Sequence, residues 1–123
     1  MCLITDHEVD LRYPSFGEWM ADPGHVGVLR LPTPDWGVTD DDRLLDLARQ
    51  VAGQLQAGET VVTHCGAGLG RTGVLCTLVL VVLGLDLAGA AAAVRAGRPG
   101  SGPDSEEQRV QLERVAAVAA SSA

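Results

Sequence analysis

The stretch that most constrains the fold is "TVVTHCGAGLGRTGVL", which runs from Thr60 to Leu75. Its β-branched start is typical of a buried strand. The strand pattern stops at Cys65, four of the next eight residues are glycine, and an apolar run follows. A strand, a glycine-rich loop and a helix in this order place the loop at the carboxyl end of a strand, where open α/β sheets bind their ligands. The stretch therefore predicts an α/β fold with its functional site in this loop.

The rest of the chain alternates between extended and helical patterns. Strands are predicted at residues 2–5, 25–31 and 60–64, and a proline-rich loop at 32–37. Helices are predicted at 14–22, 39–58, 74–85, 86–97 and 104–120, and the third of them is expected to begin near 71–73. Thr39 or Asp40 is expected to cap the second helix and Asp86 the fourth. This alternation indicates a central, mostly parallel sheet flanked by helices. No linker or repeat divides the chain, so residues 1–123 are expected to form one domain.

The charge pattern limits the partners. The net charge of −7 argues against nucleic acid and anionic membranes, because both select basic surfaces. All nine basic residues are arginine, a bias that we interpret as the mark of a GC-rich, bacterial genome. The first ten residues lack the basic start and the long apolar run of a signal peptide. The most apolar stretch, 74–85, is too short to span a bilayer.

The cysteines indicate the compartment. Cys2, Cys65 and Cys76 leave one thiol unpaired in any disulfide scheme, and none of them stands in a zinc-type spacing. A reducing, cytoplasmic setting is the simplest interpretation. We expect neither a metal nor a cofactor.

The glycine-rich loop has the composition of an anion site. Gly66, Gly68 and Gly70 carry no Cβ, so the loop can turn its amides inward, and the start of the following helix attracts negative charge. Arg71 adds a planar fork that holds two phosphate oxygens. The same field favours the thiolate form of Cys65, which is the nucleophile. Together these groups suit attack on phosphorus.

The loop has two other interpretations. A buried structural cysteine in a tight turn would explain Cys65 alone, but not His64, the alternating glycines, Arg71 and Thr72 together. A nucleotide-binding P-loop is excluded, because that motif requires a lysine and the chain has none.

The segment "HCGAGLGRTG" resembles the HCxxGxxR[ST] signature of cysteine-dependent protein phosphatases. "LPTPDWGVTDDD" and "RAGRPGSGPDSEEQ" stand at matching distances on either side, so the resemblance covers most of the chain. The short length is similar to the dual-specificity branch, and the two loops are most similar to the cyclin-dependent-kinase-associated phosphatase group. The resemblance implies a dual-specificity phosphatase-like α/β fold that is short at its N-terminus.

The resemblance also implies roles for the loop residues. Cys65 would be the nucleophile that forms phosphocysteine, and the Thr72 hydroxyl would contact its sulfur. His64 would orient the loop through a hydrogen bond of its ring. The phosphate would be bound by residues Gly66, Ala67, Gly68, Leu69, Gly70 and Arg71, and phosphate or vanadate is expected to occupy the same place.

The expected general acid is Asp35 in "PTPDWG", because prolines stiffen its loop and Gly37 permits movement. Asp40 is the second candidate, although it is better interpreted as a first-turn acid of the next helix. Gln108 resembles the glutamine that positions water in related families, while a solvated helix face explains it equally well. Cys2 is a candidate resolving cysteine, and Cys76 a core residue.

The sequence therefore predicts a metal-independent phosphomonoester hydrolase acting on phosphotyrosine proteins, with phosphoserine or phosphothreonine as further substrates. An inositol phosphate, phospholipid or RNA 5′-phosphatase is the first alternative, and a non-catalytic phosphate-binding adaptor is the second. In the family, other elements precede the strand that resembles "CLIT". The sequence therefore predicts either a homodimer through the N-terminal edge or a chain of low stability whose natural form begins further upstream.

Overall fold

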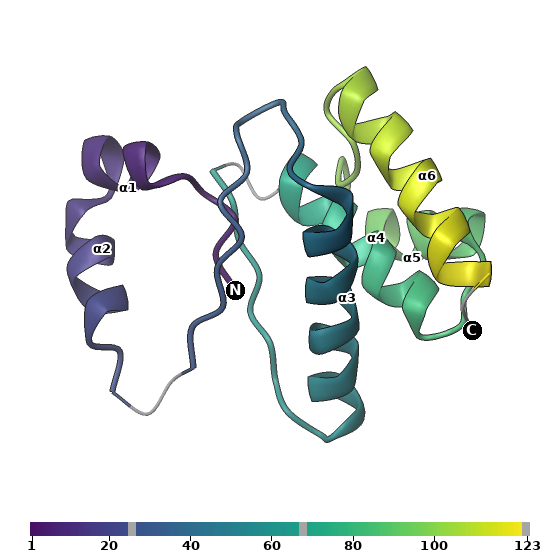
Figure 1. The fold of residues 1–123 in the computed structure, drawn as a ribbon, viewed down its shortest axis with the longest axis horizontal. Coiled ribbons are helices and arrows are strands. Elements are labelled where there is room, and N and C mark those ends of the chain that lie inside the picture. Colours follow the sequence, from purple (N-terminus) through teal and green to yellow (C-terminus); the bar gives the residue numbers. More distant parts are fainter. Residues whose placement is uncertain (25–26, 67–68, 122–123) are drawn as a thin grey trace.

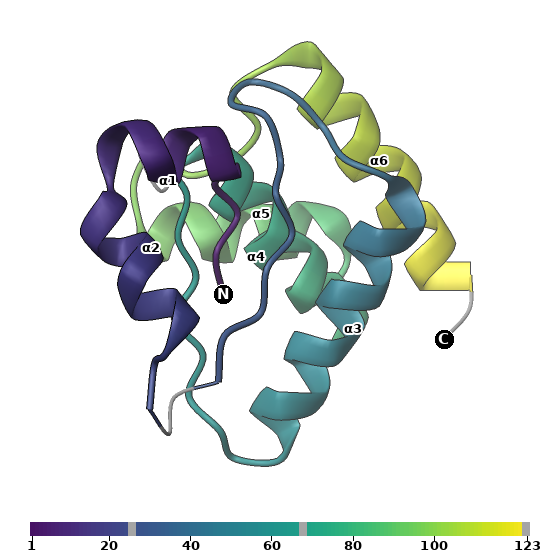
Figure 2. The same cartoon turned by 60° about the vertical axis from the view of Figure 1, so that its left-hand side comes forward.

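The computed structural model describes residues 1–24, 27–66 and 69–121. Within them lie six α-helices, α1 (Asp6–Arg12), α2 (Pro14–Ala21), α3 (Asp41–Gln56), α4 (Gly70–Val82), α5 (Leu87–Gly97) and α6 (Glu106–Ser121). Three extended segments run between α1 and α2 on one side and α3 to α6 on the other (Figure 1). In Figure 2, α1 and α2 again lie on the left, and α3 and α6 on the right.

Helix α4 is the centre of the core. It packs against α3, α5 and α6, and Leu75 and Leu78 on it are almost fully buried. An apolar helix surrounded by other helices needs no polar face, which explains the continuous run "VLCTLVLVV". The helix expected to begin near 71–73 and to include the apolar run 74–85 is confirmed, and it extends from Gly70 to Val82.

The expected central sheet is not formed by the described residues. Cys2 makes isolated parallel bridges with Arg30 on one side and with His64 on the other. The Cys2 N–H donates to the Leu29 carbonyl (2.8 Å) and the Leu3 N–H to the His64 carbonyl (3.0 Å). The bridged segments are thus parallel, as predicted, and the N-terminal segment lies in the middle. The N-terminal extended segment ends at Thr5, which is the N-cap of α1.

Helix α1 was not predicted from the sequence. Its N-cap, Thr5, accepts a hydrogen bond from the Glu8 N–H, and the Glu8 carboxylate accepts from the Thr5 N–H, which completes a capping box. The signal for it, Thr5 followed by Glu8, is present in the sequence.

The other helices agree with the sequence patterns. Asp40 caps α3 and Asp86 caps α5, each by accepting from a backbone N–H three residues on. Gly58 takes the positive φ (+86°) expected of a glycine just after a helix end. No helix in the described part of the chain has the length and apolar character that crossing a membrane requires.

Candidate active site

The start of α4 places a thiol, a hydroxyl and uncapped amides together. Cys65 is buried, and its Sγ accepts a hydrogen bond from Oγ1 of Thr72 at 3.1 Å. Leu69 is the N-cap of α4, and its side chain caps no amide. Since the first amides of a helix lack intrahelical partners, they can bind an anion here. Of the predicted loop residues, Ala67 and Gly68 lie outside the described part of the chain.

The Arg71 guanidinium is fixed by hydrogen bonds to the Glu8 carboxylate and the Thr33 carbonyl. Its Nη1 donates to Oε1 of Glu8 (2.7 Å) and to the Thr33 carbonyl (2.8 Å), and its Nη2 donates to Oε2 of Glu8 (3.0 Å). A guanidinium has five N–H donors, so Nε–H and one Nη2–H have no hydrogen-bond acceptor among the described residues. These two donors lie on one edge of the plane and form a fork suited to phosphate.

Glu8 is the functional residue that the sequence analysis missed. Its carboxylate is half of a bidentate ion pair whose arginine side chain is only 2% exposed. The hydrogen bonds from Arg71 lower the pKa of Glu8 to about 2, against the smaller opposing effect of burial. Glu8 is therefore an anion that fixes the guanidinium plane. The capping-box pattern could have predicted α1, but not that its glutamate contacts Arg71, which lies 63 residues further along the chain.

Two glycines of the loop allow close approach. A Cβ on Gly66 would lie 3.0 Å from Nη2 of Arg71, and a Cβ on Gly70 would overlap the Asp104 carboxylate. The predicted loop glycines thus serve packing as well as backbone freedom. Arg71 lies directly over the residue that follows the nucleophile.

Asp35 lies at the same site from a distant part of the sequence. Its Oδ1 is 3.6 Å from Nη2 of Arg71, and its side chain is 55% exposed. It belongs to a turn in which the Gly37 N–H donates to the Pro34 carbonyl (3.0 Å) and the Trp36 N–H donates to Oδ1 of Asp35 (3.1 Å). The structure thus brings the predicted acid next to the predicted phosphate-binding arginine.

Helix α6 anchors the loop that carries Asp35. Gln108 donates from Nε2 to the Gly37 carbonyl (3.2 Å) and accepts at Oε1 from the Asp104 N–H (2.8 Å). Gln111 donates to the Thr39 carbonyl at 2.6 Å. Because Gln108 is only 2% exposed, its interpretation as part of a solvated helix face is wrong. Its amide is occupied at both ends by backbone groups of the two loops that flank the site.

The surroundings of His64 and of the other two cysteines are as follows from their contacts and burial. The His64 ring meets Phe16 edge to face, with centroids 5.0 Å apart. Burial lowers the pKa of His64, the N-terminal amine lowers it further, and a hydrogen bond with the Cys65 backbone opposes both. Cys2 is buried in the core. Burial raises the pKa of Cys76, and the neighbouring Cys65 raises it further. The resolving role of Cys2 stays a prediction.

A cavity lies away from this site. It has a volume of about 780 Å³ and lies between α2 and the segments 27–29 and 59–64, with Phe16, Trp19 and His64 in its wall. Its described lining includes neither Cys65 nor Arg71, so the assignment of the site follows the reactive groups rather than the cavity. Among the described residues, no three His, Cys, Asp or Glu side chains gather closely enough to hold a metal ion.

Solved structures resemble this chain closely. It is 29% identical to Tk-PTP in its active form, with a TM-score of 0.77 over 94% of this chain and 76% of that one. A mutant form of Tk-PTP is 33% identical, with a TM-score of 0.79 over 95% and 75%. Human DUSP28 is 18% identical, with a TM-score of 0.73 over 99% and 95%, and shows the fold alone.

The likeness extends to a protein family. Residues 3–120 match the model of the family described as PTP-SAK, the Swiss Army Knife protein DSP-PTPase phosphatase domain. That match covers nearly the whole chain, including the Cys65 loop, the Asp35 turn and both flanking glutamines. The dual-specificity phosphatase-like fold and a phosphatase activity are thereby supported. The chain belongs to the PTP-SAK family of DSP-PTPase phosphatase domains.

Proposed function

We propose that this protein hydrolyses phosphotyrosine in protein substrates through a phosphocysteine intermediate, without a metal. In the first step the Cys65 thiolate attacks phosphorus and the bond between phosphorus and the leaving oxygen breaks. Asp35 gives a proton to that oxygen, which leaves as a phenol. The fork of Arg71 and the amides at the start of α4 bind the equatorial oxygens throughout.

In the second step water attacks the phosphorus of phosphocysteine. Asp35, now a carboxylate, takes a proton from the water, and the bond between phosphorus and sulfur breaks. The Thr72 hydroxyl, 3.1 Å from Sγ, stabilises the departing thiolate by donating to it. Inorganic phosphate leaves, and the thiolate and the protonated Asp35 are restored.

The observation that carries the proposal is the approach of Asp35 to Arg71. Asp35 has its Oδ1 3.6 Å from Nη2 of the arginine that we propose to bind phosphate, which supports a role for this carboxylate at the leaving oxygen. A phosphate-binding adaptor has no need of an acid at that position. An enzyme that protonates a leaving group needs it there.

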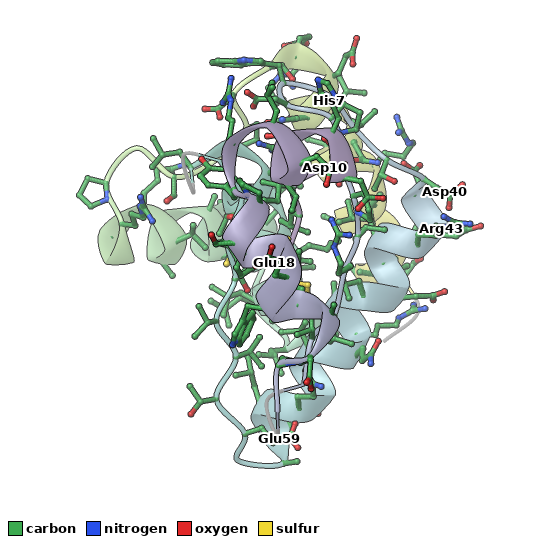
Figure 3. The ribbon with its side chains drawn as sticks, turned by 90° about the vertical axis from the view of Figure 1, so that its left-hand side faces the viewer. His7, Asp10, Glu18, Asp40, Arg43 and Glu59 are labelled. Carbon is green, nitrogen blue, oxygen red and sulfur yellow. The ribbon has the colours of Figure 1, made fainter. Side chains whose placement is uncertain are left out.

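Charge around the site favours protein substrates over polyanions. Asp35 lies beside Arg71, and Asp104 lies against Gly70. Asp10 on α1 and Asp40 at the start of α3 are exposed on the face shown in Figure 3. An inositol polyphosphate or an RNA end would bring several further negative charges next to Asp35 and Asp104. A single phosphate on a peptide avoids that repulsion.

Several finer expectations accompany this function. We expect the partner to be a phosphoprotein, with phosphoserine and phosphothreonine proteins as slower substrates. The odd number of thiols favours a reducing, cytoplasmic location, and the arginine bias favours a bacterial source. The likeness of the two loops to the cyclin-dependent-kinase-associated group stays a prediction.

One panel of substrates tests the proposal. The protein is assayed on phosphotyrosine, phosphoserine and phosphothreonine peptides, on inositol phosphates and on an aryl phosphate, with Cys65→Ser as a control. We expect the highest kcat/KM on phosphotyrosine peptides and no turnover by Cys65→Ser, which should still bind phosphate. Faster hydrolysis of inositol phosphates would favour the first alternative, and absence of turnover by the wild type would favour the adaptor.

A further inference from the structure

The turn that carries Asp35 is attached to the rest of the molecule at both of its ends. Before the turn, the Thr33 carbonyl accepts a hydrogen bond from Nη1 of Arg71 at 2.8 Å. After it, the Gly37 carbonyl accepts one from Nε2 of Gln108 at 3.2 Å. Because the Asp35 side chain is 55% exposed, packing does not fix it, and these two attachments determine where its carboxylate lies.

Gln108 is a rigid point of attachment. The residue is only 2% exposed, and α6, which carries it, packs against α3 and α4. Its Oε1 accepts from the Asp104 N–H at 2.8 Å, so the amide cannot turn away from Gly37 without breaking a second hydrogen bond. A buried amide that is bonded through both of its polar atoms is costly to move. One side chain therefore fixes the end of the acid turn relative to the core.

Hydrogen bonds rather than packing hold this turn against the core. A cavity of about 20 Å³ remains there, with Thr33, Gly37, Arg71 and Gln108 among its lining residues. This volume has room for about one water molecule, and the atoms around it lack packing contacts on that side. Loss of the bond from Gln108 would consequently leave the Gly37 end of the turn loosely held.

We propose that Gln108 is the positioning residue of the general acid: it holds Gly37 so that the Asp35 carboxylate lies beside Arg71. This inference rests on the proposed function, in which Asp35 protonates the leaving oxygen. It differs from the role that the resemblance implies for Gln108, which is the positioning of water in the second step. A group that orients an attacking water must be open to that water, whereas this amide is buried and bonded to two backbone groups.

Two kinetic constants separate these roles. The value of kcat/KM covers the steps up to departure of the leaving group, whereas kcat also contains hydrolysis of phosphocysteine. Gln108→Met keeps the size of the side chain and removes both hydrogen bonds. It should lower kcat/KM about tenfold or more for aryl phosphates with poor leaving groups, and less than about threefold for good ones, because only the former depend on a well-placed acid. An unchanged kcat/KM with a lower kcat and accumulated phosphocysteine would assign Gln108 to the water and overturn the proposal.

A double-mutant cycle shows whether Gln108 acts through Asp35. In the Asp35→Asn background the general acid is absent, so Gln108→Met should have no further effect on the dependence on the leaving group. Gln111→Leu is the matched control, because Gln111 is also buried on α6 (3% exposed) but donates to the Thr39 carbonyl, beyond the turn. It should lower the melting temperature comparably and keep the wild-type ratio between poor and good leaving groups. Multiplied effects in the cycle, or equal slowing of all substrates by Gln108→Met, would assign Gln108 to the fold and overturn the proposal.

A measurement without turnover completes the test. Amide hydrogen exchange of Gly37, whose N–H donates to the Pro34 carbonyl at 3.0 Å, reports on the turn. Exchange should be about fivefold faster in Gln108→Met, the effect of about one lost hydrogen bond, and unchanged in Gln111→Leu. If Gln108→Met does not fold, Gln108→Glu at pH 8 takes its place, since it keeps the acceptor for Asp104 and loses the donor to Gly37. Unchanged exchange of Gly37 would overturn the proposal even in an active phosphatase. Absence of turnover by the wild type would overturn the proposed function, and the exchange would still decide whether Gln108 holds the turn.

Discussion

Arg71 can bind a phosphate in a defined orientation because Glu8 and the Thr33 carbonyl occupy three of its five donors. A free arginine on a loop would lose much more conformational freedom on binding. Here the fork of Nε and Nη2 is set before substrate arrives. At the scale of single residues, the site is therefore an arrangement of charges around one guanidinium, with Asp35 on the side of the leaving group.

Glu8→Gln should weaken both stability and phosphate binding. It leaves the buried guanidinium without its charged partner, at a cost on the order of 2–3 kcal/mol in the free energy of unfolding at pH 7. The KM should rise about tenfold. Urea denaturation and steady-state kinetics measure the two effects. Glu18→Gln, an exposed acid on α2, is the control and should change stability by less than about 0.5 kcal/mol.

The loss of stability caused by Glu8→Gln should depend on pH, and the pKa of Glu8 determines the direction of that dependence. The pKa of Glu8 is lowered from its ordinary 4.5 to about 2 in the folded protein. Its contribution to stability is therefore complete above pH 4.5 and is lost as the pH falls toward 2. The difference between the wild type and Glu8→Gln should be constant from pH 7 to 5 and shrink below 4.5. A difference that grows on acidification would contradict the ion pair.

Asp35→Asn should separate substrates by their leaving groups. Loss of the general acid should slow poor leaving groups about 10²–10⁴-fold and good ones far less. A series of aryl phosphates with graded phenol acidity measures the dependence. Asp40→Asn is the matched control, because asparagine also caps helices well, and the rates should stay those of the wild type. Equal slowing of every substrate by Asp35→Asn would mean that Asp35 is structural.

At the scale of elements, α4 carries the site because a loop can approach its first turn. The Leu69 carbonyl accepts from the N–H groups of both Gly73 and Gly102, each at 3.0 Å. This approach brings the segment 98–102 against α4 and places Asp104 beside Gly70. The loop before α6 and the phosphate loop therefore form one packed unit.

Two glycine-to-alanine changes should have opposite effects on stability. A Cβ on Gly73 would lie 2.3 Å from the Gly102 nitrogen, so Gly73→Ala must separate two backbones and should cost about 3 kcal/mol. A Cβ on Gly53, within α3, meets nothing, so Gly53→Ala should stabilise by about 0.5–1 kcal/mol. Thermal or urea unfolding measures both. Destabilisation by both variants, or by neither, would contradict this packing.

The helices were predicted correctly because their signals, caps and apolar runs, involve residues close together in the sequence. Asp40 and Asp86 bond to amides three residues away, and the apolar run of α4 needs only its neighbours in sequence to be recognised. The sheet was overestimated because a β-branched run indicates extended backbone but not the length of the ladder. That length depends on where Thr5 starts α1.

The site residues that belong to a recognisable sequence motif were predicted, and those outside a motif were not. Cys65, Arg71 and Thr72 stand in one short segment, and Asp35 in a recognisable turn. Glu8 could not be assigned from the sequence, because its contact with Arg71 arises only when α1 folds over the loop. The strain at Trp36 was likewise not predictable, since nothing in "PDWG" distinguishes a positive φ at the tryptophan from one at the glycine.

At the scale of the whole molecule, a homodimer stays a prediction, although the N-terminal segment itself lies between two other extended segments and is not an edge. Segment 61–63 has the N-terminal segment on one side, with the Met1 amine donating to the Val62 carbonyl at 2.9 Å. Val62 itself is 74% exposed. Light scattering over a concentration series, with a thermal melt at each point, should show a dimer whose midpoint rises with concentration. A monomer with a constant, high midpoint would contradict it.

The central claim is that phosphate passes through the sulfur of Cys65. Asp35→Asn should still react with an aryl phosphate that has a good leaving group, while attack by water on the intermediate is slowed. Acid quenching followed by peptide mass spectrometry should then find one phosphate on the peptide that contains Cys65. Cys65→Ser should show none. Turnover by the wild type with no phosphate on Cys65, or with phosphate on another residue, would contradict the account.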